Sequence, residues 1–93
     1  VTMEYYKNSK QDWMDNKDKF LEMLKGKRKP YKIEFTFVRN SRRKFDYINP
    51  AQTVQDMMVK YGYLEDDNVT IMIPFFGKYS VDKEGAGVYI RVL

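Results

Sequence analysis

The segment from Lys32 to Val38 most constrains the fold, because its side chains alternate between polar and apolar types. The apolar positions are Ile33, Phe35 and Phe37. A period of two residues with aromatic and β-branched side chains predicts a strand that is buried on one face. Since a strand cannot bury that face alone, we expect helices to pack against it.

A helix is predicted before this strand. It begins near Ser9, with Asp12 in its first turn, and ends at Gly26. Its apolar side chains recur at helical spacing: Trp13, Phe20, Leu21 and Leu24.

A second helix is predicted after the strand, and it has the strongest local signal in the chain. In Asn49-Pro50-Ala51-Gln52, Asn is a good N-cap, Pro suits the first helical position, and Gln can close a capping box. Gly62 is the expected C-terminal stop. The apolar face consists of Val54, Met57, Met58 and Tyr61.

Two more strands are predicted in the last third of the chain. Residues 69–75 would place Val69, Ile71 and Ile73 on one face, and residues 88–92 would form the final strand. The turn-rich connection between them favours a long hairpin. The predicted fold class is therefore α+β, with two helices packed on a small mixed β-sheet in a single domain, 1–93. Because the chain begins with Val, we expect its natural start to be missing.

The composition narrows the possible chemistry. The chain has no Cys and no His, which excludes zinc fingers and thiolate or imidazole catalysis. Any bound metal should have oxygen ligands. The lack of Cys, of a signal peptide and of an apolar run near ~20 residues predicts a cytoplasmic protein without a membrane span.

The positive charge is concentrated in one stretch. From Lys25 to Lys44 there are nine basic residues and one acid, whereas the rest of the chain has eight basic and twelve acidic residues. A basic stripe in an otherwise acidic chain favours nucleic-acid binding. The loop at 25–30 is more typical of a solvated connection. The predicted DNA contacts are Arg39, Arg42, Arg43 and Lys44.

Carboxylates flank the second helix. Asp46 precedes it, and Asp66 and Asp67 follow it. The helix is roughly 18 Å long, and five residues can reach back about 16 Å, so Asp46 and Asp67 could share a site. Nothing in the spacing compels this. Acidic turn capping and surface ion pairs are the ordinary alternatives.

From about Phe37 to its end, the chain resembles the RusA-type Holliday junction resolvases. The basic run before Asp46 is similar to that of the family, and the match continues to Asp67 without a gap. The matching residues are Arg42, Arg43, Lys44, Asp46, Asn49, Asp56, Gly62, Asp66 and Asp67. Two positions differ, because the family's second Asp falls on Ile48 and its helix Lys falls on Gln52. The family's N-terminal strand is not evident.

The resemblance implies a RusA-like homodimer that binds four-way DNA junctions and nicks opposing strands with Mg²⁺, or with Mn²⁺. Asp46 and Asp67 would be catalytic metal ligands, with Asp66 as a ligand or a support for one. Asn49 or Glu65 could replace the missing carboxylate, since Mg²⁺ accepts amide oxygens. Three alternatives stay open: an active nuclease, a catalytically impaired module that binds branched DNA, and an interaction domain whose aromatic residues form a dimer interface.

Overall fold

The computed structural model describes residues 2–3, 10–39, 48–82 and 84–93. Both predicted helices and the strand predicted at 32–38 are present, together with shorter strands. In chain order the elements are β1 (Thr2–Met3), α1 (Lys10–Leu24), β2 (Tyr31–Arg39), α2 (Ile48–Lys60), β3 (Met72–Phe76), β4 (Ser80–Val81) and β5 (Gly87–Val92). The α+β class is therefore confirmed.

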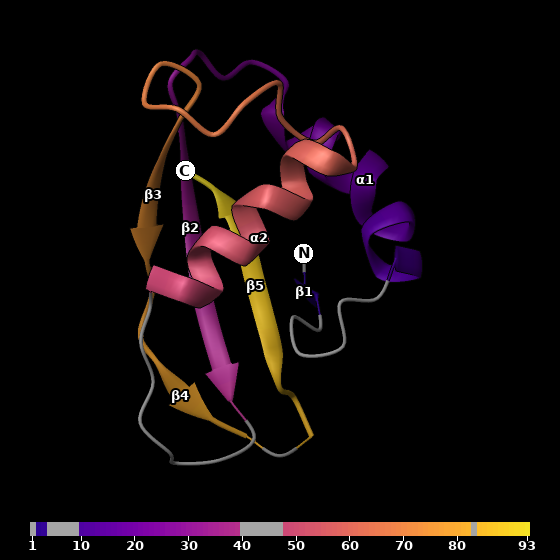
Figure 1. The fold of residues 1–93 in the computed structure, drawn as a ribbon, viewed down its shortest axis with the longest axis vertical. Helices are drawn as coiled ribbons and strands as arrows, with labels where there is room; N and C mark the ends of the chain where they lie inside the picture. The colour runs from indigo at the N-terminus through magenta and orange to yellow at the C-terminus, as the bar shows by residue number, and fades with distance from the viewer. Residues whose placement is uncertain (1, 4–9, 40–47, 83) are drawn as a thin grey trace.

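Strand β2 is the centre of the sheet. The strand order is β1-β5-β2-β3, and the short β4 also pairs with β2 (Figure 1). β2 runs parallel to β3 and β4 and antiparallel to β5. The sheet is thus mixed, as predicted.

The core lies between one face of the sheet and the two helices. Ile33, Phe35 and Phe37 have no exposed surface, which confirms the predicted inward face of β2. α2 crosses in front of the strands in Figure 1. The helices contribute Trp13 and Phe20 from α1 and Val54 and Met58 from α2 to the same core.

The opposite face of the sheet carries the alternate side chains and has no helix over it in the described part of the chain. There Arg91 Nη2 lies 3.1 Å from Glu34 Oε1, between neighbouring strands. Phe75 and Tyr89 are each 40% exposed. An exposed ion pair of this kind stabilises the fold little, by at most about 1 kcal/mol.

The predicted hairpin between the last two strands is wrong. β3 and β5 lie on opposite sides of β2 and do not pair with each other. The reason is that β2, α2 and β3 form a strand–helix–strand unit, and a helical crossover delivers its second strand parallel to the first. The chain from β4 to β5 then passes the end of β2, where Val38 pairs with both Ser80 and Gly87.

The start of β3 is also later than predicted. Residues 68–71 form a turn, in which Asn68 O accepts the backbone N–H groups of Ile71 (3.0 Å) and Met72 (3.1 Å). Val69 is 72% exposed, and Met72 is the buried residue. The Asn68 side chain caps its own backbone two residues on, and this local bond outweighs the β-propensity of the segment.

The first and last strands of the described chain are neighbours in the sheet. β1 pairs antiparallel with β5, with Thr2 opposite Tyr89 and Met3 opposite Val88. A short N-terminal strand is therefore present, although the sequence pattern did not reveal it. Two residues are too few to show a periodicity.

Candidate metal and nucleic-acid site

The site is built on the loop that follows α2. Gly62 has a φ of +79°, and its N–H donates to Val59 O at 3.2 Å. The N–H of Tyr63 donates to Met58 O at 2.8 Å. This pair of bonds is a Schellman motif, which requires a left-handed residue at the position of Gly62. The predicted helix stop is confirmed, and the turn sends the chain back along α2.

Tyr63 anchors the base of this loop. Its side chain is 2% exposed, and its hydroxyl donates to the backbone carbonyl of Trp13. Its ring packs edge-on against Trp13, with centroids 5.2 Å apart, and in a tilted orientation against Phe20, with centroids 5.1 Å apart. Burial raises the pKa of the Tyr63 hydroxyl, and the charge of Asp12 adds to this. The hydroxyl is therefore a neutral structural donor.

Beyond this anchor, Asp67 returns to the N-terminal half of α2. Gln52 Nε2 lies 3.4 Å from Asp67 Oδ2 and donates at 2.9 Å to Asp56 Oδ1. The sequence argument that the loop can reach back along the helix holds for Asp67. The resulting group contains two carboxylates with an amide donor between them.

Asp66 has a different role from its neighbour. Its Oδ1 accepts the N–H of Asp67 at 2.7 Å, and its Oδ2 accepts Asn68 Nδ2 at 3.0 Å. The backbone bond, followed by the Asn68 bond, lowers the pKa of Asp66 and keeps it ionised. These contacts are those of an acidic residue that caps a turn, which was the ordinary alternative to a metal site. Metal binding by Asp66 would therefore have to use its remaining lone pairs.

Several predicted site residues fall outside the described residues: Arg42, Arg43, Lys44 and Asp46. Asn49 lies in the first turn of α2. Arg39 ends β2, and its carbonyl accepts the N–H of Asp82 at 2.8 Å. Within the described ranges no three acidic residues gather as a metal site would require. Asp67 and Asp56 offer the oxygen donors that suit Mg²⁺, but they need further ligands.

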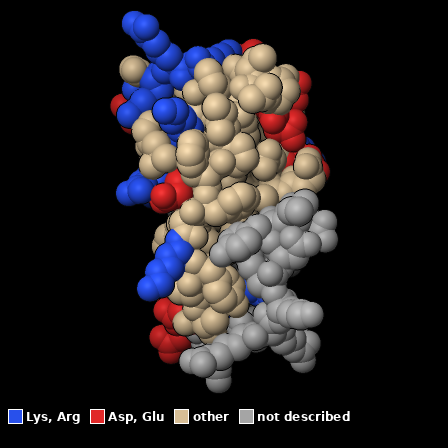
Figure 2. Space-filling model, turned by 90° about the vertical axis from the view of Figure 1, so that its left-hand side faces the viewer, with Lys and Arg blue, Asp and Glu red and all other residues tan. Residues whose placement is uncertain are grey.

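The described basic residues of the stripe lie in the turn before β2 and along β2 as far as its last residue, Arg39. Figure 2 shows Lys and Arg gathered at the upper end, where the turn between α1 and β2 carries Lys25, Lys27, Arg28 and Lys29. Arg39 lies at the other end of β2, about 26 Å away for a nine-residue strand. The sequence already distinguishes the loop at 25–30 from the predicted DNA contacts that begin at Arg39, and the extended strand β2 holds that loop and Arg39 apart.

The contact of Gln52 with both carboxylates was not predicted. The contact with Asp56 could have been predicted from the sequence, because Gln52 and Asp56 are four residues apart and residues at i and i+4 meet on one helix face. The contact with Asp67 joins residues 15 apart, and no local pattern indicates it.

Neither helix of the described chain has the length and apolar content to cross a bilayer. The chain matches no model of a known protein family and no curated protein.

Proposed function

We propose that this protein is a Mg²⁺-dependent endonuclease that cleaves branched DNA, such as four-way junctions, in recombination and repair. The observation that carries the proposal is the position of Asp67. Its carboxylate lies beside Gln52 in the N-terminal half of α2, and that helix begins two residues after Asp46. A shared metal site would need one carboxylate from the segment before the helix and one from the segment after it.

In this proposal, Asp46 and Asp67 hold the metal, and Asn49 or Asp66 adds an oxygen donor. Bound Mg²⁺ would activate water and stabilise the charge that develops on the phosphate. Arg42, Arg43 and Lys44 hold the flanking phosphates. Because the chain has no His, no imidazole is available as a base.

Gln52 stands where the resemblance expects a Lys. Its amide donates to Asp56 and Asp67, which orients both carboxylates without adding a charge. A neutral donor supports a metal ligand but neutralises no phosphate. The proposed enzyme therefore depends more on its metal and its arginines.

The test is cleavage of a synthetic four-way junction in Mg²⁺ by Asp67→Asn. Loss of a metal ligand is expected to lower the rate at least ~100-fold, because metal stabilisation of transition-state charge amounts to several kcal/mol. Junction binding, measured in EDTA, should persist. Asp18→Asn is the matched control, since Asp18 is an exposed carboxylate on α1. Wild-type cleavage by Asp67→Asn would refute the proposed role.

A second candidate function is branched-DNA binding without catalysis. It is favoured by the Gln52 amide, which occupies both nearby carboxylates, and by Ile48, which offers no oxygen. This function predicts junction binding that weakens steeply with salt, and no nicking by the wild type in Mg²⁺ or Mn²⁺.

A homodimer is part of either candidate. The exposed aromatic side chains of Phe75 and Tyr89, on the uncovered sheet face, support a surface for subunit contact. The test compares the molecular mass of the wild type and of Phe75→Ser by analytical ultracentrifugation, and the variant should shift toward the monomer. If Arg42→Ala with Arg43→Ala leaves junction binding intact, the interaction-domain alternative is favoured instead.

A further inference from the structure

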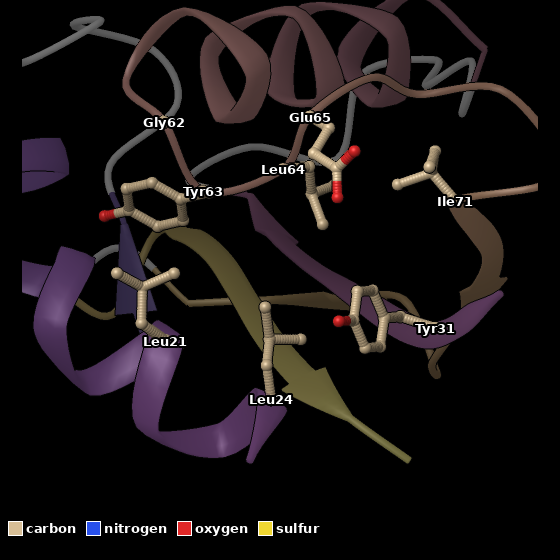
Figure 3. Close-up of a pocket in the computed structure, with 8 residues that line it drawn as sticks. All are labelled: Leu21, Leu24, Tyr31, Gly62, Tyr63, Leu64, Glu65 and Ile71. Atoms are coloured by element: carbon tan, nitrogen blue, oxygen red, sulfur yellow. The ribbon is translucent and has the colours of Figure 1, made fainter. Parts of the chain in front are cut away.

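A hollow of about 390 Å³ opens beside the loop that carries Asp67. It lies between the C-terminal half of α1, the start of β2 and the residues after Gly62. Figure 3 shows side chains from all three segments pointing toward it. Its walls are mostly apolar: Leu21, Leu24, Tyr31, Leu64 and Ile71. This volume lies in the range of small-molecule sites, roughly 300–1,000 Å³.

The rim of the hollow is charged. Glu65, which lines it, forms an ion pair through Oε1 with Lys29 Nζ, and this hydrogen bond raises the pKa of Lys29. Within the described residues, Glu65 Oε2 has no partner. Lys27 and Arg28 stand in the same exposed turn as Lys29. The basic turn, which the proposed nuclease chemistry does not use, therefore lies next to an apolar hollow.

The hollow is close to the proposed metal site along the chain. Glu65 and Asp67 are two residues apart, which limits their Cα separation to about 7 Å. That is roughly the span of one or two nucleotides, because successive phosphates in a duplex strand rise about 3.4 Å. A ligand at the Glu65 rim of the hollow would thus lie within one or two nucleotides of a phosphate at Asp67.

We infer that the hollow binds an unpaired nucleobase adjacent to the cleaved phosphate. This inference rests on the proposed function and adds a substrate class, DNA with an extruded or unpaired base at the branch. The apolar walls and the Tyr31 ring suit the flat faces of a base. Glu65 Oε2 can accept a hydrogen bond from an exocyclic amino group, and Lys27, Arg28 and Lys29 complement the phosphates. An apolar peptide would gain nothing from these cations.

The experiment measures binding in EDTA, so that no metal-dependent step contributes. The probe is a fluorescent four-way junction with one unpaired cytosine at the branch, compared with the same junction carrying an abasic nucleotide there. Loss of one stacked base should weaken wild-type binding at least fivefold. Leu21→Trp, which fills the hollow from a residue 37% exposed, should weaken binding of the cytosine junction equally and leave the abasic junction unchanged.

Met14→Trp is the matched control, because Met14 is a 55% exposed apolar residue of α1 that does not line the hollow. It should bind both junctions as the wild type does. The inference would be overturned if the wild type bound the two junctions equally well. It would also be overturned if Leu21→Trp bound the cytosine junction as tightly as the wild type does. If the base preference is found but Mg²⁺ produces no cleavage, the base site stands and the nuclease proposal falls. If the protein cleaves the junction but shows no base preference, the nuclease proposal stands and the base site falls.

Discussion

Replacing Gly62 with Ala tests the turn that directs Asp67 back to α2. At a φ of +79°, an L-residue with a Cβ costs about 1–2 kcal/mol. The added Cβ would also lie 2.9 Å from Lys17 Nζ, but that is the end of a flexible side chain and can move. Thermal unfolding followed by circular dichroism should therefore show a melting temperature lower by about 4–8 °C per kcal/mol.

Gly26→Ala is the control that measures the free-energy cost of the left-handed backbone conformation alone. Gly26 has a φ of +77°, and its added Cβ would meet nothing within 4 Å. Both variants should lose similar stability, and Gly62→Asn should lose less, because Asn tolerates the left-handed region. If α2 instead continued through residue 62, Ala would stabilise the protein by about 1 kcal/mol relative to Gly. A rise in the melting temperature of Gly62→Ala would therefore refute the proposed turn.

Three further outcomes are expected. Tyr63→Phe should destabilise the protein by about 1 kcal/mol in denaturant titration, because the buried Trp13 carbonyl loses a donor; an unchanged midpoint would contradict this. Because the pKa of Asp66 is lowered in the folded protein, its ionised form stabilises the fold. This stabilisation is fully present at pH values above the ordinary carboxyl pKa of about 3.9, and it is lost as the pH falls through the lowered pKa. Asn68→Ala should raise that pKa toward the ordinary value in a carboxyl NMR titration, and no change would show that the Asn68 amide is unimportant. Added EDTA should abolish junction cleavage but not binding, and cleavage that survives EDTA would exclude the metal.

Local patterns predicted much of this fold. The alternation in β2 identified its buried face because side-chain direction in a strand follows a period of two, whatever the strand pairs with. Gly62 marked the end of α2 because only a residue without a Cβ adopts its conformation freely. The carboxylate pair after that turn was found in the same way, from residue types and spacing.

Local information in the sequence was therefore enough to identify the two helices, the buried face of β2 and the candidate carboxylates. Only the folded chain shows that β2 separates β3 from β5 and that Gln52 joins Asp56 to Asp67. Each of these depends on contacts between residues far apart in the chain. Periodicity carries no information about such contacts, because many strand orders bury the same apolar faces.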